Sequence, residues 1–367
     1  MAQRQAVLAD FKENTMNFKK TLTGAIILLA LTTSTFAKAK KTEKNNKLKV
    51  VTTIFPEYDW VREIIGDTNS AELTLLLGNG VDLHSYQPSI QDIAKISTAD
   101  IFIYVGGESD GWVADALKNA TNKNMKVINL METLGDKVKA EEVKEGMQAE
   151  EEEEHEHHHD GDHDEDEDEN HDHEAEGHHH HHHDDEDEVE YDEHVWLSLR
   201  NAKILSAEIA AALSEKDQAN AASYKANLAS YSARLDALDA KFTAAVKAGS
   251  KKTILFGDRF PFRYLVDDYG LDYFAAFVGC SAETEASFET VIFLSKKVDE
   301  LGLNSVLKIE SGDGKIARTI IQNTKNKNAR VLTLDSIQST TAKQAKAGTT
   351  YLKIMEANLD VLTEALK

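Results

Sequence analysis

Short apolar runs alternate with amphipathic stretches from residue 48 to residue 130. The runs are nearly continuous in Val, Ile, Leu and Phe and are bounded by Gly, Pro or polar residues, which is typical of strands buried on both faces of a parallel sheet. The predicted strands are LKVVTTIFP (48–56), AELTLLL (71–77), ADIFIYVGG (99–107) and MKVINL (125–130). Helices are predicted between them at 57–65, 90–99 and 112–121. This order indicates an α/β lobe.

The same alternation returns after a long alanine-rich stretch, residues 223–249, which predicts one helix ended by Gly249. The later predicted strands are KTILFG (252–257), LDYFAAFV (271–278), SVLKIE (305–310) and RVLTLD (330–335). The later predicted helices are 262–269, 287–301, 315–324 and 351–366. We therefore expect an α/β protein of two parallel-sheet lobes, 48–222 and 250–367, linked by one long rigid helix. Ligands of such sheets bind at the carboxyl ends of the strands, so the cleft between the lobes is the expected site.

Residues 1–37 predict a signal peptide. A short basic region begins at Met16, and the apolar run that follows is too short to span a bilayer. Because the basic region starts at an internal methionine, residues 1–15 are interpreted as a possible upstream extension. No cysteine follows the apolar run, so no lipid attachment is expected there, and Cys280 is the only cysteine in the chain. The signal predicts a periplasmic protein.

The strand and helix pattern stops at residues 141–190, which consist almost entirely of Glu, Asp, His and Gly. Such a segment lacks the apolar side chains needed to offset the entropy of ordering, so it is predicted to be a disordered loop within the first lobe. Residues 150–193 hold 25 acidic and no basic side chains, while the whole chain has a net charge of −23. The rest of the chain is thus nearly neutral, which argues against a basic nucleic-acid-binding surface. The acidic segment itself favours cations as partners.

Histidine is concentrated in this acidic segment, where 13 of the 15 histidines fall. The run GHHHHHH at 177–183 is interpreted as native because it belongs to a longer segment of the same character. Imidazoles beside carboxylates predict several weak, pH-sensitive metal sites. The candidate auxiliary ligands are His155, His157, His158, His159, His163, His171, His173, His178, His179, His180, His181, His182 and His183. The two remaining histidines, His84 and His194, lie at the edges of predicted elements, which also indicates metal binding.

The sequence resembles the solute-binding proteins of zinc and manganese ABC importers, in the zinc-uptake branch of the cluster A-I type. The resemblance covers residues 48–367 and rests on GVDLHSYQPSIQDIAKISTADIFIYVGG, DEHVWLSLRNA and VLTLDSI. It implies two lobes that clamp one divalent metal ion and deliver it to a permease in the inner membrane. The implied ion is Zn²⁺, with Mn²⁺ as the alternative, and the implied state is a monomer.

The resemblance implies His84, His194 and Asp335 as metal ligands. At the fourth position the family has a histidine or glutamate, but this chain has Arg259, which stays protonated and cannot ligate a cation. The neighbouring Asp258 is our predicted substitute. The alternatives left open are Glu283, Glu285, Cys280 or a water molecule.

No catalytic role is expected, because the chain has no phosphate-binding loop with Lys, no G-x-S-x-G and no H-E-x-x-H. One alternative is a zinc-dependent hydrolase with Glu310 as general base, and esterase or phosphatase activity that follows bound zinc would reveal it. A second alternative is a surface adhesin, which would bind its target in the metal-free state.

Overall fold

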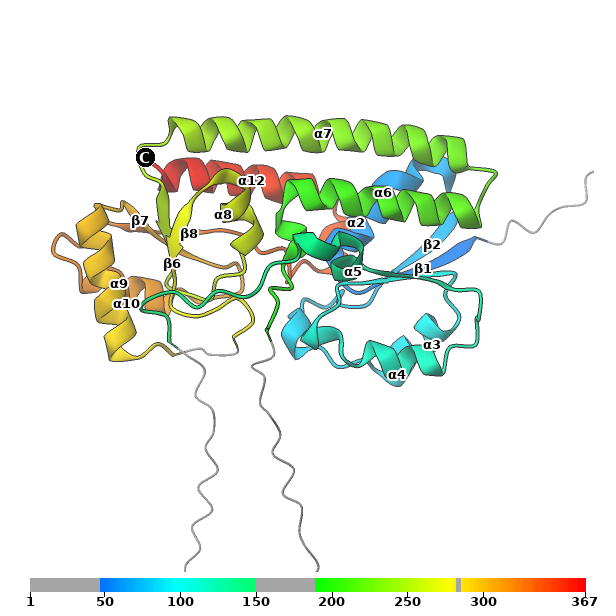
Figure 1. The fold of residues 1–367 in the computed structure, drawn as a ribbon, viewed down its shortest axis with the longest axis horizontal. Coiled ribbons are helices and arrows are strands. Elements are labelled where there is room, and N and C mark those ends of the chain that lie inside the picture. Colours follow the sequence, from blue (N-terminus) through cyan, green and yellow to red (C-terminus); the bar gives the residue numbers. More distant parts are fainter. Residues whose placement is uncertain (1–46, 149–188, 282–284) are drawn as a thin grey trace, which may run out of the picture. The chain divides into compact units, whose positions relative to one another are not determined.

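Four parallel strands form the sheet of the first half, in the computed structural model that describes residues 47–148, 189–281 and 285–367 (Figure 1). The strands are β1 (Leu48–Thr52), β2 (Ala71–Leu75), β3 (Ile101–Tyr104) and β4 (Lys126–Asn129), in the order β2-β1-β3-β4. Val50 pairs with Leu73 on one side and with Ile101 on the other. All four strands lie within predicted strands, because strand pairing and burial both favour these apolar runs. The prediction of a strand over 48–56 is wrong beyond Thr52, since Phe55 and Pro56 form the first turn of the helix that follows.

The strands of the second half form two parallel pairs. They are β5 (Thr253–Leu255) with β6 (Asp272–Phe274), and β7 (Ser305–Lys308) with β8 (Arg330–Thr333). A single parallel bridge between Phe256 and Leu307 connects the two pairs. The prediction of a strand over 271–278 is wrong beyond Phe274. Phe277 is fully buried but makes only an isolated bridge, so its apolar character reports core packing and not strand pairing.

The long helix α7 (Ala221–Ala248) confirms the predicted alanine-rich helix. It packs against α6 (Leu199–Lys216), which the sequence analysis did not assign, and against α12 (Tyr351–Ala365) (Figure 1). Tyr351 ties α12 to the first half, since its backbone nitrogen donates to Asp59 at 2.6 Å. The other helices are α2 (Phe55–Ile65), α3 (Ile90–Ser97), α4 (Val113–Lys118), α5 (Leu130–Leu134), α8 (Arg263–Tyr269), α9 (Phe288–Leu301), α10 (Lys315–Gln322) and α11 (Ala342–Lys346). Helical cross-links of this kind make Leu48–Lys367 one compact unit.

The two described ends of the acidic segment are ordered, so the prediction of disorder is wrong for residues 141–148 and 189–190. The backbone nitrogen of Glu141 donates to the carbonyl of Glu190 at 2.9 Å, and that of Gln148 donates to Ala276 at 2.9 Å. These backbone hydrogen bonds hold the two ends in place, although the segment has few apolar side chains. The thirteen clustered histidines lie outside the described residues, as does the predicted signal peptide. No helix in the described ranges is both long and apolar enough to cross a membrane.

Candidate metal centre

His84 lies in the loop after β2, on the single 3₁₀ turn Leu83–Ser85. The carboxylate of Asp82 caps this turn by accepting a hydrogen bond from the backbone nitrogen of His84 at 3.1 Å. Leu83 is buried in the core and anchors the turn. On the imidazole ring, Nδ1 lies 2.7 Å from Oγ of Ser109, which follows β3. The ring is therefore held through Nδ1, which leaves Nε2 for another partner.

His194 is fully buried and directly precedes the 3₁₀ turn Val195–Leu197. The carboxylate oxygen Oδ1 of Asp192 accepts a hydrogen bond from the backbone nitrogen of His194 at 2.8 Å and lies 3.1 Å from its Nδ1. A carboxylate at one ring nitrogen fixes the tautomer and orientation of a histidine whose other nitrogen binds metal. The geometry of His194 has this form.

The two histidines meet, with their Nε2 atoms 3.2 Å apart. Cys280 from the second half joins them, and one ligand atom from each of His84, His194 and Cys280 lies within 4.8 Å of the other two. Within the described ranges this is the only such group of three His, Cys, Asp or Glu side chains. Gly279 permits the approach, because a Cβ there would lie 3.1 Å from Cε1 of His194. The structure thus brings together both predicted histidines and one of the alternatives to Asp258.

A cavity of about 260 Å³ opens onto His84 and Cys280. Its acidic lining includes Glu193, whose Oε1 accepts a hydrogen bond from the backbone nitrogen of Ser109 at 2.9 Å. The other oxygen of Glu193 is buried without a hydrogen-bond partner among the described residues, and it lies 3.6 Å from Nδ1 of His84. The cavity lining is His84, Glu108, Ser109, Glu141, Glu190, Tyr191, Glu193 and Cys280. Four glutamates around nitrogen and sulfur donors give the cavity a negative potential that attracts cations.

Burial lowers the pKa of His84 to about 3, and the neighbouring His194 and Arg259 add to the effect. The ring is therefore neutral at physiological pH and has a lone pair for a metal ion. Burial also raises the pKa of the Cys280 thiol, and the nearby carboxylates of Glu141 and Glu193 raise it further. A metal ion bound to this sulfur would have to displace its proton.

Asp335 follows β8, and its carboxylate accepts a hydrogen bond from the backbone nitrogen of Ile337 at 2.7 Å. It is not part of the His84–His194–Cys280 group. Burial and the charge of Glu310 raise its pKa to about 7. The loop that carries Asp335 nevertheless contacts His194 through Gln338. When the Gln338 amide is oriented with its nitrogen toward Asp82, its oxygen accepts a hydrogen bond from Nε2 of His194 at 2.9 Å.

Glu310, the general base of the hydrolase alternative, is occupied with this loop. Its carboxylate accepts hydrogen bonds from the backbone nitrogen of Ser336 at 2.7 Å and from the hydroxyl groups of Ser336 and Ser339, both at 2.9 Å. These contacts give Glu310 a structural role in the loop that carries Asp335.

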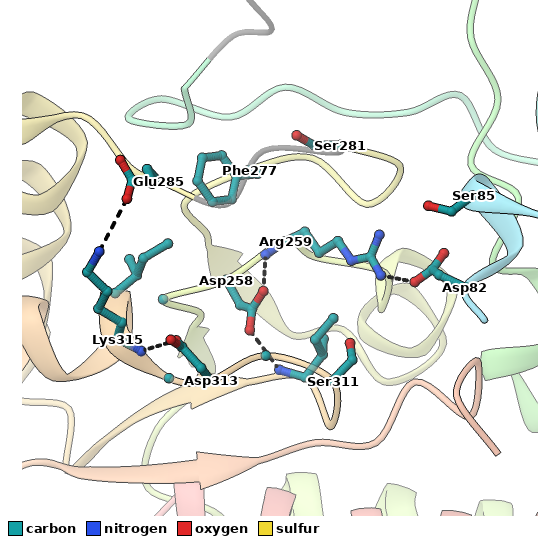
Figure 2. A pocket seen from close by; sticks show the side chains of 15 residues that line it. Asp82, Ser85, Asp258, Arg259, Phe277, Ser281, Glu285, Ser311, Asp313 and Lys315 are labelled. Atoms are coloured by element: carbon teal, nitrogen blue, oxygen red, sulfur yellow. Dashed lines mark hydrogen bonds and ion pairs between the residues drawn. The ribbon is translucent and has the colours of Figure 1, made fainter. Parts of the chain in front are cut away.

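Arg259 and Asp258 line a different cavity, of about 520 Å³ (Figure 2). The Arg259 side chain extends to Asp82 and forms an ion pair with it. The Asp258 carboxylate accepts hydrogen bonds from the backbone nitrogens of Arg259 at 3.0 Å and Ile309 at 3.2 Å. The structure does not bring Asp258 together with the two histidines. Burial raises its pKa, which the two backbone donors partly oppose.

Of the two remaining alternatives, Glu285 also lies apart from the histidines and forms an exposed ion pair with Lys315 at 3.3 Å (Figure 2). Glu283 is outside the described residues. The parts played by Ser109, Asp192 and Glu193 were not predicted from the sequence. The adjacency Asp-Glu-His at 192–194 was the available signal for the last two, since a carboxylate close in sequence to a metal-binding histidine often orients it.

These observations define a class of fold. Two α/β halves with parallel strands and a long linking helix, with two histidines and a cysteine brought together, characterise a two-lobed solute-binding protein. The match of residues 50–365 to the model of the family "zinc-uptake complex component A, periplasmic" makes the assignment specific, and the chain belongs to that family.

Individual relatives agree with this assignment. The zinc-binding protein AdcA of Streptococcus pyogenes serotype M3 is 29% identical over 92% of this chain and 60% of its own length. The high-affinity zinc uptake system protein ZnuA of Bacillus subtilis is 27% identical over 94% of this chain and 96% of its own length. The crystal structure of the Zn(II)-bound ZnuA-like domain of Streptococcus pneumoniae AdcA superposes with a TM-score of 0.61 at 25% identity, over 88% of this chain and 99% of that domain. The chain thus spans only about three fifths of the first of these relatives.

Proposed function

We propose that this protein captures a zinc ion outside the cytoplasm and delivers it to an ABC-type permease in the inner membrane. The observation that carries the proposal is the pair of Nε2 atoms of His84 and His194, which lie 3.2 Å apart while Ser109 and Asp192 hold the Nδ1 atoms. Two imidazoles presented in this way suit zinc. Family membership and the zinc-binding relatives support the same ion.

Zinc is favoured over manganese by the chemistry of the donors. Manganese prefers oxygen ligands, whereas the atoms that the structure gathers are nitrogen and sulfur. Asp335 stays our proposed oxygen ligand, because the loop from Asp335 to Gln338 contacts His194. Export by the predicted signal peptide, and function as a monomer, also belong to the proposal.

A role without catalysis is proposed as well. The side chain that a hydrolase would use as general base, Glu310, accepts hydrogen bonds from the loop that carries Asp335. The relatives named above are described by zinc binding or zinc uptake.

The histidine-rich segment is proposed to hold several weak zinc sites that raise the local ion concentration beside the tight site. Its composition supports this, and so does the position of its described ends. Glu141 and Glu190 line the same cavity as His84 and Cys280. Removal of residues 149–188 should abolish the weak zinc equivalents in a calorimetric titration and leave one tight site.

The central test is zinc titration of metal-free protein without residues 149–188, beside its His84→Ala variant. We expect one tight zinc site that weakens at least 100-fold in the variant, because a ligand is lost. Gln87→Ala is the matched control, since Gln87 is an exposed residue of the same loop and should leave the affinity unchanged. Wild-type affinity in His84→Ala would contradict the proposed site.

A further inference from the structure

The resemblance implies two ligands from the second half of the chain, and at one of these two positions the metal centre has no usable side chain. Arg259 occupies that position, and its guanidinium is paired with Asp82. Two imidazoles and the proposed Asp335 leave one ligand of a four-coordinate zinc ion to be supplied. The remaining donor must therefore come from another side chain or from water.

We propose that the thiolate of Cys280 is a third ligand, so that His84, His194 and Cys280 form a centre with two nitrogen ligands and one sulfur ligand. The inference rests on the proposed zinc-binding function and specifies its chemistry. Cys280 is the side chain of the second half that the structure places with both histidines, within 4.8 Å.

The distances agree with tetrahedral zinc. With Zn–N bonds of about 2.0–2.1 Å, two nitrogen ligands of a tetrahedral ion are about 3.3 Å apart, and with a Zn–S bond of about 2.3 Å a nitrogen and a sulfur are about 3.6 Å apart. The observed Nε2–Nε2 separation is 3.2 Å, and the sulfur lies within 4.8 Å of one nitrogen of each ring. The histidines thus already stand at ligand spacing, and the sulfur is close enough to join them after a small movement of its side chain.

The backbone around Cys280 is held against the histidines from two sides. The backbone nitrogen of Cys280 donates to Oε1 of Glu141 at 3.2 Å. Gly279 lies so close to the ring of His194 that an added Cβ would be 3.1 Å from Cε1. A residue with a side chain at position 279 would push the segment away from His194. These contacts direct position 280 to the cavity that His84 also lines.

Arg259 is a positioning residue in this arrangement. Its backbone forms a parallel bridge with Phe277, which precedes Cys280 by three residues, and its guanidinium pairs with Asp82. Asp82 in turn caps the turn that carries His84. The arginine that replaces the family ligand therefore connects the cysteine segment to the histidine loop. Replacement of an oxygen or nitrogen ligand by sulfur also shifts the preference of the centre toward thiophilic ions such as Zn²⁺ and Cd²⁺, and away from Mn²⁺.

The test uses the full mature chain and Co²⁺ as a spectroscopic substitute for zinc. Because Cys280 is the only cysteine, any sulfur-to-cobalt charge-transfer absorption reports on this residue, whatever the other histidines bind. We expect such absorption in the wild type, its loss in Cys280→Ser, and its loss in His84→Ala, which places sulfur and imidazole on one ion. Zinc affinity should fall at least 10-fold in Cys280→Ser.

A second measurement does not depend on the folding of a variant. Zinc at the tight-site equivalent should protect Cys280 of the wild type from alkylation by iodoacetamide, while Mn²⁺ at the same concentration should not. Absence of charge-transfer absorption, together with unchanged zinc affinity in Cys280→Ser, would overturn the inference. If His84→Ala still weakens zinc in that case, the proposed function survives and only the sulfur ligand is excluded. If neither variant weakens zinc, both proposals fail.

Discussion

The cavity lined by His84 and the cavity lined by Arg259 differ in whether their charged and polar groups are already paired. The Arg259 cavity is about twice as large, 520 Å³ against 260 Å³, and its charged groups are bonded to one another or to the backbone. Arg259 pairs with Asp82, and Asp258 accepts two backbone hydrogen bonds (Figure 2). The smaller cavity is lined by the His84 imidazole, the Cys280 thiol and Glu193, one of whose oxygens has no hydrogen-bond partner among the described residues. Available lone pairs, and not volume, identify the metal centre.

The largest effect is expected from His194→Ala. The substitution removes a buried ligand and leaves Asp192 without its imidazole partner, so tight zinc binding should weaken by at least 100-fold, or about 2.7 kcal/mol. Competition with a zinc chelator of known affinity measures the loss. Retention of the tight site would move the metal centre away from the smaller cavity.

Asp192→Asn should have the next largest effect. The amide keeps the shape of the side chain but loses the charge that orients Nδ1 of His194, and loss of such a partner costs about 10-fold to 100-fold in metal affinity. The same competition assay applies. Equal affinities of variant and wild type would show that burial alone orients the ring.

Asp110→Asn tests whether the raised pKa of a buried carboxyl beside the smaller cavity makes the stability of the fold depend on pH. Burial and the charge of Glu193 raise the pKa of Asp110 to about 7, and one of its oxygens lacks a partner among the described residues. Since the unfolded chain titrates near 3.9, the folded state binds the extra proton, and its stability falls as pH rises from about 4 to 7. The variant should lose this part of the decline, which is at most about 4 kcal/mol between pH 4 and pH 7. Urea unfolding at both pH values measures it, and an unchanged slope would contradict the assignment.

Asp258→Asn should have the smallest effect. An asparagine oxygen can still accept the hydrogen bond from Ile309, and the carboxylate lies in the larger cavity, so zinc affinity should stay within about 3-fold of the wild type. A loss of zinc affinity as large as that of His194→Ala would restore Asp258 as the ligand from the second half. Both cavities would then contribute to metal binding.

Local patterns in the sequence were sufficient for most of the fold. Strands β1 to β4 lie within predicted strands and helix α7 matches a predicted helix, because each is specified by its own apolar or alanine-rich run. Strand β6 ends before the predicted strand does. Phe277 extended the apolar pattern because it packs in the core, and not because it belongs to the strand. The ends of the acidic segment are ordered by hydrogen bonds to Ala276 and between Glu141 and Glu190, which composition does not encode.

The sequence by itself singled out the two histidines that the structure brings together. His84 and His194 stood out because the other thirteen are gathered in one acidic segment. Only the tertiary structure decided which side chain of the second half meets them. Arg259 forms an ion pair with Asp82, and Asp258 accepts a hydrogen bond from a backbone nitrogen. Cys280 lies beside the histidines, because Gly279 has no side chain to keep its segment away from the His194 ring. A ligand set is a property of distances between segments far apart in the chain, and those distances are fixed by packing and not by spacing along the sequence.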